Sequence, residues 1–513
     1  MTKKVGSVET FKDDLPPGWS SATIGELVGK NGIFKDGDWV ESKDQDPDGD
    51  VRLIQLADIG DGKYRDRSSR FLTYEKAIAL RCTFLEKGDV LVARMPDPLG
   101  RACLFPGDKK KSVTVVDVCV VRPEDKTISK RWLMYFINAP AFRSVVASLQ
   151  TGSTRKRISR KNLAKISFPV PPSNEQQRIV AEIEKQFSRL DEAVENLKRV
   201  KANLKRYKAA VLKAAVEGKL TEEWRKAKPN VEPADKLLDR ILTERRKKWE
   251  QAELAKMKAN GKSPKDDKWK KKYKTPALPK DVSLPNIPEE WCWVKTEILA
   301  ADEDNAICAG PFGTIFKAKD FRPEGIPIIF LRHVAPGKYL THKPGFMDVK
   351  KWEELFQPYS VFGGELLVTK LGEPPGVCAI YPENVGPAMV TPDVIKMSVN
   401  DNYINSKYLM HYFNSQVARH FATGLAFGTT RLRLTLPIFR NLFVPLAPLK
   451  EQNLIVDELE RILTVVVSLE EEVRKKLYYA DRLRQAILKK AFSGKLVPQE
   501  ETADNPPQQK KAI

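Results

Sequence analysis

The sequence has few cysteines and histidines and no long apolar run, and each shortage excludes a class of protein. The six cysteines among 513 residues lie far apart and form no C-x-x-C pair, so neither a zinc framework nor a disulfide-rich secreted domain is expected. The four histidines all lie in the second half, and no two have metal-ligand spacing. No apolar run is long enough to span a bilayer, and the amino terminus is polar. We therefore expect a soluble, cytoplasmic protein that binds no metal.

Basic residues are in clear excess. The chain has 88 lysines and arginines against 67 acidic residues, a net charge of +21. This excess of positive charge is typical of proteins that bind phosphate groups, although a ribosome-associated or membrane-surface protein would also have it. Two windows, residues 141–174 and 417–450, contain basic side chains and no Asp or Glu. Because the two windows lie at one repeat spacing, they favour surfaces that face a polyanion over loops that are basic by chance.

A long internal repeat organises the chain. Glu175-Gln176 recurs 276 residues later as Glu451-Gln452, and the same shift carries Gly218-Lys-Leu onto Gly494-Lys-Leu. A period this long indicates a duplicated domain with its helix, not a solenoid. The binding partner is therefore expected to have two parts.

The predicted fold class is α+β, with two strand-rich domains separated by two long helices that pair as an antiparallel coiled coil in a pseudo-twofold internal repeat. Short apolar runs broken by Gly, Pro and Asp predict the strands. The expected segments are a flexible amino terminus (residues 1–14), a first strand-rich domain (15–166), a first helix (167–220), a charged linker with an amphipathic helix (221–283), a second strand-rich domain (284–442), a second helix (443–496) and a disordered tail (497–513).

Apolar residues at heptad spacing predict the pairing of the two helices. Each helix is expected to run for about 44 residues, and the pair is antiparallel because the connecting chain must return to begin a second domain. The predicted seam consists of Ile183, Phe187, Leu190, Val194 and Leu197 in the first copy and Leu459, Leu463, Val466, Val473 and Leu477 in the second.

The segment between the two copies is the least globular part of the sequence. Residues 221–280 hold 19 basic and 10 acidic residues. Residues 234–257 have the pattern of an amphipathic helix, and the chain beyond them is interpreted as an exposed linker. A solvated tether is favoured here over a non-specific DNA contact.

Several motifs together resemble those of a known family. They are the Pro-Pro-x-x-Glu-Gln-x-x-Ile entry to each long helix, the Gly-Lys-Leu exit, the Leu/Ile-Pro-x-x-Trp opening of each domain, and the duplication of all three. The chain resembles the specificity (S) subunit of type I restriction-modification systems over nearly its whole length.

The resemblance implies a role without catalysis. Each strand-rich domain would be a target-recognition domain that reads one half of a split, asymmetric DNA target, with the two halves in neighbouring major grooves about one helical turn apart. The paired helices would bind two methyltransferase (M) subunits, and restriction (R) subunits would join the full complex. S-adenosylmethionine, ATP and magnesium would be bound only by those partner subunits, and no cofactor by this chain.

Two sets of DNA-binding residues are predicted. The phosphate contacts are Arg155, Lys156, Arg157, Arg431 and Arg433, with Arg94 and Lys370 as a further matched pair. The base contacts are Asp36, Asp38 and Trp39 in the first domain and Phe312 and Thr314 in the second, where Gly310-Pro-Phe-Gly-Thr314 resembles a family loop that lies against DNA.

Two alternatives from other classes remain open. Asp48, Asp61 and Lys63 fit the loose pattern of a metal-dependent endonuclease, although Pro336 replaces Asp61 in the second copy. A basic RNA-associated scaffold is the other, and it is weakened by the lack of stacked-aromatic motifs in the strands. For DNA methylation by the chain itself, Asn505-Pro-Pro-Gln508 is a poor match to a catalytic loop.

Overall fold

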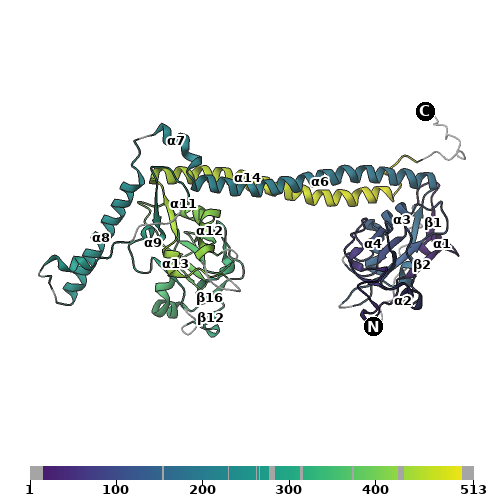
Figure 1. Ribbon diagram of the computed structural model, residues 1–513, viewed down its shortest axis with the longest axis horizontal. Helices are drawn as coiled ribbons and strands as arrows, with labels where there is room; N and C mark the ends of the chain where they lie inside the picture. Colours follow the sequence, from purple (N-terminus) through teal and green to yellow (C-terminus); the bar gives the residue numbers. More distant parts are fainter. Residues whose placement is uncertain are drawn as a thin grey trace, which may run out of the picture. The chain divides into compact units, whose positions relative to one another are not determined.

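The computed structural model describes residues 15–96, 98–152, 155–228, 230–261, 263–264, 266–276, 284–311, 316–372, 375–425 and 432–499. The chain divides into two compact units, unit 1 (Met1–Arg199 and Val473–Ile513) and unit 2 (Val200–Glu472). Each unit contains one strand-rich domain and parts of two long helices, α6 (Ser173–Val216) and α14 (Leu449–Ala491), which Figure 1 shows in teal and yellow. Among the described residues, no helix combines the length and apolarity needed to cross a membrane.

The domain of unit 1 is built from short strands with helices near its end. Its elements are β1 (Ser20–Thr23), α1 (Ile24–Val28), β2 (Ile33–Asp36), β3 (Val51–Ile54), β4 (Phe71–Leu72), α2 (Tyr74–Ala79), β5 (Val90–Ala93), β6 (Ala102–Leu104), β7 (Lys111–Thr114), β8 (Val118–Arg122), α3 (Lys130–Ile137), α4 (Pro140–Ser148), α5 (Arg160–Ala164) and β9 (Ser167–Val170).

The main sheet of unit 1 is antiparallel with strand order β2-β8-β5-β6, and β4-β3-β7 form a second sheet in which β3 and β7 are parallel. Alternate residues of a strand face opposite sides of its sheet. Accordingly, Val90 and Val92 pack with Phe136 in one hydrophobic cluster, whereas Leu91 packs with Ile54 in another. Strands β1 and β9 pair antiparallel, which closes the domain where α6 begins.

The domain of unit 2 has more strands. Its elements are β10 (Cys292–Lys295), α9 (Thr296–Leu299), β11 (Ile307–Ala309), β12 (Phe321–Arg322), β13 (Ile326–Ile329), β14 (Val334–Ala335), β15 (Lys338–Tyr339), β16 (Gly345–Met347), α10 (Val349–Lys351), β17 (Ser360–Val361), β18 (Leu366–Thr369), β19 (Cys378–Ile380), β20 (Ala388–Val390), β21 (Val394–Met397), α11 (Ser406–Phe413), α12 (Gln416–Leu425), α13 (Leu436–Arg440) and β22 (Phe443–Leu446). Two more helices, α7 (Glu222–Ala227) and α8 (Ala234–Ala259), precede this domain.

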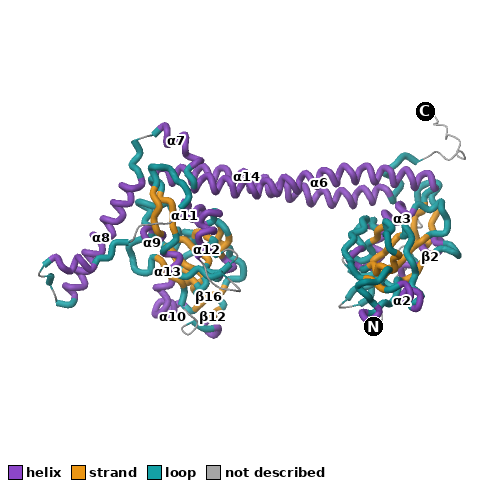
Figure 2. Tube along the Cα trace, viewed as in Figure 1, coloured by secondary structure: helices purple, strands orange, loops and turns teal. Residues whose placement is uncertain are grey.

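The main sheet of unit 2 repeats that of unit 1, whereas the second sheet has five strands, in the order β12-β16-β13-β20-β17, in place of three. The order β11-β21-β18-β19 corresponds to β2-β8-β5-β6, the parallel pair β13 and β20 to β3 and β7, and the closing pair β10 and β22 to β1 and β9. Figure 2 shows the strands concentrated in the two domains, whereas α6 and α14 are uninterrupted helix.

Matched asparagines hold a helix against the edge of each main sheet. The Asn138 side chain, at the end of α3, donates to the carbonyl of Ala102 (2.8 Å) and accepts from its N–H (2.9 Å). Asn414, at the end of α11, does the same with Cys378 at 2.7 and 3.2 Å. Buried polar groups require such partners, so the duplicated asparagine fixes the same packing in both domains.

The two long helices pair in opposite directions within each unit. In unit 1, Ile183 near the start of α6 packs with Ile487 near the end of α14. In unit 2, Val211 near the end of α6 belongs to one hydrophobic cluster with Leu459 near the start of α14. The predicted α+β class with an antiparallel pair of long helices is therefore confirmed.

The seam positions vary in exposure along the helices. Ile183, Leu459, Val466 and Val473 are buried, whereas the other predicted seam residues are partly exposed; they are Phe187, Leu190, Val194, Leu197, Leu463 and Leu477. In unit 1, Arg484 lies over the Phe187 ring at 4.5 Å and forms an ion pair with Asp191. A charged residue is thus accommodated in the seam because an aromatic face and a carboxylate both contact it.

Candidate nucleic-acid interface

Each domain is joined to its helix by a tryptophan and a glutamate. In unit 1 the indole N–H of Trp19 donates to Glu175 Oε2 at 3.0 Å, and the amide of Gln499 donates to Glu175 Oε1 at 2.9 Å. Trp19 and Glu175 are both buried. The buried carboxylate therefore connects the start of the domain, the start of α6 and the chain that follows α14.

The same junction recurs in unit 2 with a stronger set of donors. The indole N–H of Trp291 donates to Glu451 Oε2 at 2.9 Å, and the hydroxyl of Thr221 donates to Oε1 at 2.5 Å. Arg225 forms an ion pair with the same carboxylate. Glu451 is fully buried, and a charge in that setting needs a counter-charge and hydrogen bonds.

The glutamine of each Glu-Gln pair fastens a second helix. Gln176 accepts from the backbone N–H of Ser129, the N-cap of α3, at 2.8 Å. Gln452 accepts from the N–H of Asn405, the N-cap of α11, at 2.9 Å. The Glu-Gln motif is thus the structural base that orients each strand-rich domain, a role that the sequence pattern alone did not predict.

The glycines of the two Gly-Lys-Leu exits allow close packing at these junctions. A Cβ on Gly494 would lie 2.5 Å from Pro16, and a Cβ on Gly218 would lie 2.5 Å from Pro288. Both glycines also have positive φ. Any larger residue would push the exit away from the domain opening.

The first group of predicted phosphate contacts lies on exposed residues 151–152 and 155–157, which we call the basic loop. Thr151 and Arg157 exchange backbone hydrogen bonds of 2.8 Å, so the loop closes on itself. Arg155, Lys156 and Arg157 are exposed. Three adjacent exposed cations suit a phosphate backbone.

The equivalent part of unit 2 is described only in part. Arg433 is exposed and bridges to Leu371, whereas Arg431 lies outside the described residues. Lys370 is buried, and this burial together with the nearby charge of Arg433 lowers its pKa. Arg433 is therefore the accessible phosphate candidate of this unit.

Arg94 and Asp36 are engaged with each other inside unit 1. Their side chains form a 2.6 Å ion pair, and Arg94 also donates to the carbonyls of Ile158 and Val116 at 3.0 and 3.1 Å. Only 14% of the Arg94 side chain is exposed. These contacts weigh against Arg94 as a phosphate contact and Asp36 as a base contact.

Asp38 and Trp39 have different surroundings. Asp38 accepts from the backbone N–H of Thr83 at 2.9 Å, and burial raises the pKa of its carboxyl. Trp39 is 69% exposed, with its indole N–H donating to Glu41 at 3.2 Å. An exposed tryptophan needs a partner for its apolar face, so Trp39 stays the better base-contact candidate of the two.

The two base contacts predicted in unit 2, Phe312 and Thr314, lie outside the described residues. A pocket of about 690 Å³ has a lining that includes Pro311, Phe316, Phe321 and Phe330. Arg332 lies over the Phe330 ring at 4.1 Å. These residues were not predicted from the sequence, because their aromatic side chains form one surface only when the segments that carry them pack together.

Two of the three residues of the nuclease alternative form ion pairs within the protein, whereas Asp48 is exposed. Lys63 forms a 2.7 Å ion pair with Asp191 on α6, and Asp61 forms a 3.1 Å ion pair with Arg143 on α4. Among the described residues, no group of three or more His, Cys, Asp or Glu side chains is placed to hold a metal ion. The endonuclease alternative therefore gains no support.

Comparison with known proteins defines the class. A family model described as the type I restriction modification DNA specificity domain matches residues 16–206 and 314–478. The chain belongs to this family. The predicted resemblance is thereby confirmed, as is the prediction of a DNA-recognition subunit rather than an enzyme.

Named relatives agree with this assignment. The chain is 25% identical over 392 residues to the type I restriction enzyme EcoKI specificity subunit of Escherichia coli K12, covering 75% of this chain and 69% of that protein. It is 22% identical over 538 residues to the EcoAI specificity subunit of E. coli, covering 93% and 83%.

Two solved structures share the fold. One comes from work on complex assembly and conformational transition of the type I R-M system, with a TM-score of 0.63 and 18% identity over 94% of this chain and 99% of that one. The other is the HsdS subunit from Thermoanaerobacter tengcongensis, with a TM-score of 0.53 and 17% identity over 95% and 99%.

Proposed function

We propose that this chain recognises an asymmetric, two-part DNA target and brings methyltransferase and restriction subunits to it. The observation that carries the proposal is the pair of domains with one topology, each joined to its own helix by a buried tryptophan–glutamate bond. Two strand-rich domains that are attached in the same way but differ in sequence would bind two different half-sites. The target would therefore lack the palindromic symmetry that a homodimer reads.

The accessible cations would bind the sugar-phosphate backbone, and side chains nearby would read base edges. The basic loop serves unit 1 and Arg433 serves unit 2. Trp39 is the base-contact candidate that the surface of unit 1 favours. Phosphate contacts position a protein on the duplex, whereas base contacts specify the sequence.

The outer faces of the long helices are the candidate surfaces for methyltransferase subunits. In unit 1, Tyr478, Tyr479 and Leu483 on α14 are 59%, 63% and 52% exposed. In unit 2, Val465 and Leu469 on α14 are 52% and 48% exposed. Exposed aromatic and apolar side chains on a helix are typical of a protein interface. Binding of S-adenosylmethionine, ATP and magnesium would belong to the partner subunits.

Co-expression with its methyltransferase subunit, followed by genome-wide mapping of methylated bases, tests this proposal. The expected result is one methylated motif made of two unlike half-sites with a fixed gap. Methylation of a single uninterrupted motif, or of a perfect palindrome, would contradict it. A purified chain that cleaves DNA with magnesium alone would instead favour the nuclease alternative.

A further inference from the structure

Residues 234–261, 263–264 and 266–276 of unit 2 form a folded element that the repeat does not explain, and we call it the basic hairpin. Helix α8 has 26 residues, about 39 Å at 1.5 Å per residue, and a short 3-10 helix, η4 (Asp267–Lys272), folds back on it. The ring of Trp249 on α8 stacks on Trp269 of η4 at 6.0 Å, and Trp269 is buried. Within the chain beyond residue 257, which is interpreted above as an exposed linker, aromatic stacking orders η4.

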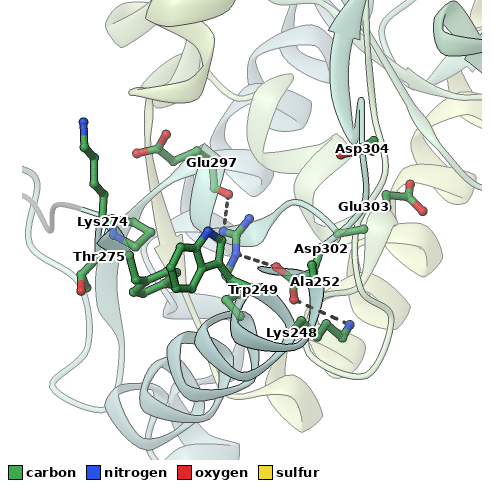
Figure 3. A pocket seen from close by; sticks show the side chains of 13 residues that line it. Lys248, Trp249, Ala252, Lys274, Thr275, Glu297, Asp302, Glu303 and Asp304 are labelled. Atoms are coloured by element: carbon green, nitrogen blue, oxygen red, sulfur yellow. Dashed lines mark hydrogen bonds and ion pairs between the residues drawn. The ribbon is translucent and has the colours of Figure 1, made fainter. Parts of the chain in front are cut away.

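The basic hairpin is fixed to the domain of unit 2 at its base. Leu237, Leu238 and Ile241 of α8 are buried in the main hydrophobic cluster of that domain. Arg245 donates to the carbonyl of Glu297 at 2.6 Å and forms a 2.7 Å ion pair with Asp302. Figure 3 labels Glu297 and Asp302 and marks interactions of both with dashed lines. The base of the hairpin is thus anchored to the domain, and α8 leads away from the strands of the domain (Figure 1).

The hairpin as a whole is strongly basic. Residues 234–276 contain 15 basic and seven acidic side chains, a net charge of +8. Five lysines are exposed and form no ion pair with any residue that the structure describes; they are Lys247, Lys258, Lys271, Lys272 and Lys274. Cations that no neighbouring acid neutralises attract an external anion.

The composition of this surface favours a nucleic acid over a protein. Protein interfaces are enriched in exposed aromatic residues, Met and Arg and depleted in Lys. No large apolar side chain between residues 234 and 276 is strongly exposed among those described, because Trp249, Trp269 and Tyr273 pack on one another. A lysine-rich surface without an apolar centre matches a phosphate backbone.

We propose that the basic hairpin binds the phosphate backbone of duplex DNA next to the half-site read by unit 2. The contact would be independent of sequence and would lengthen the footprint beside the half-site of unit 2. The hairpin also lies outside the residues matched by the family model. This inference rests on the proposed function, because it requires that unit 2 bind DNA.

The test compares the full chain with the triple variant K258Q/K271Q/K272Q on long duplex DNA of arbitrary sequence. Fluorescence anisotropy over a salt titration gives the slope of log K against log salt concentration, and the magnitude of this slope decreases by about 0.9 for each phosphate that the protein no longer neutralises. We expect the slope to become less steep by about 2 to 3 and the affinity at about 0.1 M salt to fall about tenfold or more.

Two matched variants isolate the effect. K258R/K271R/K272R keeps the charges and should keep the wild-type slope. K30Q/K87Q/K126Q removes three exposed lysines of unit 1 and should change the slope less than the hairpin variant does. Because Trp249 and Trp269 pack inside the hairpin, unchanged tryptophan emission would show that the hairpin variant remains folded.

The outcomes separate the two proposals. An unchanged slope in K258Q/K271Q/K272Q, with normal binding by the wild-type chain, overturns the hairpin proposal alone. Loss of methyltransferase co-purification in that variant at an unchanged DNA slope would also overturn it, because the surface would then bind protein. Absence of DNA binding by the wild-type chain would instead contradict the proposed function.

Discussion

The two units attach their domains to the helices in the same way but complete the attachment with different chemistry. In both, a tryptophan donates to a buried glutamate at the start of a long helix. In unit 1 the other oxygen of this carboxylate accepts a hydrogen bond from the neutral amide of Gln499. In unit 2 the corresponding oxygen forms an ion pair with the guanidinium of Arg225. The geometry of the junction has been kept after duplication, while its surroundings have diverged.

A second difference lies where each domain faces the helices. In unit 1, Asp191 forms ion pairs with both Lys63 and Arg484. The position equivalent to Asp191 in unit 2 is Val467, which is 44% exposed. The Asp191 ion pairs therefore have no counterpart at Val467, although both units keep an ion pair between a domain helix and a long helix, Arg131–Glu184 in unit 1 and Lys407–Glu460 in unit 2. The comparison teaches that both units keep the tryptophan–glutamate contact that joins domain to helix, whereas the ion pairs of Asp191 are found in unit 1 alone among the residues described.

The largest expected effect comes from removing the two glutamate charges in turn. E451Q leaves Arg225 largely buried without its main counter-charge, so local stability should fall by about 3 kcal/mol. E175Q loses only charge-assisted hydrogen bonds to neutral donors, so local stability should fall by about 1 kcal/mol. Hydrogen exchange of the β10 and β1 amides measures the two effects separately. Equal losses would show that Arg225 adds nothing specific to unit 2.

The next effect concerns DNA affinity. R155Q/K156Q/R157Q removes all three cations of the basic loop and should weaken binding about 100-fold at low salt, with the slope reduced by about 2 to 3. R433Q should lower the slope by only about 0.9. Anisotropy with one duplex compares the two variants directly. A greater loss in R433Q would reverse the assignment of the stronger phosphate contact to unit 1.

A smaller effect depends on pH. His411 of α11 occupies the position of Tyr135 in α3, and burial lowers its pKa from 6.5 to about 4. Below pH 6.5 the unfolded chain protonates this histidine, whereas the folded chain keeps it neutral. The folding stability that is present above pH 6.5 is therefore lost as the pH falls toward 4. We expect wild type to lose about 2 kcal/mol more than H411Y between pH 7 and 4, because a tyrosine does not titrate there.

Urea unfolding of both proteins at the two pH values measures this difference, since every other titrating group is shared. The side chain of Tyr135, whose pKa burial raises to about 12, shows that the fold accepts tyrosine at the equivalent position. Identical pH dependence of wild type and H411Y would contradict the assignment.

The smallest effects concern the ion pairs found only in unit 1. R484M removes an ion pair and the contact with the Phe187 ring, so the free energy of unfolding should fall by about 1 kcal/mol. K63M removes an ion pair whose lysine is 72% exposed, and less than about 0.5 kcal/mol is expected. Thermal unfolding checks the order. A larger loss in K63M would mean that the loop carrying Lys63 holds the domain against α6.

Much of the architecture could be predicted from the sequence, because each pattern occurs in both copies of the repeat. Heptad spacing predicted the paired helices, and broken apolar runs predicted the strand-rich domains. The junctions could not be predicted, because nothing in the sequence links Trp19 to Glu175, which is 156 residues away. Such a bond depends on how β1 and β9 close the domain.

The candidate site was harder to predict for a related reason. Charge can be counted from a sequence, but the direction of a side chain cannot. Arg94 was selected for its charge, and the structure directs it into the domain toward Asp36. The arginines and lysine of the basic loop carry the same charge and point to solvent. The difference lies in the backbone hydrogen bonds that close the loop, which composition does not encode.

The central claim is that each domain reads one half of the target and that the difference between the domains makes the target asymmetric. Its most direct test is a chain in which residues 287–442 also replace residues 15–166, co-expressed with the methyltransferase subunit. Methylome sequencing should then detect a palindrome built from two copies of one wild-type half-site. Methylation that still follows the original asymmetric motif would contradict the claim.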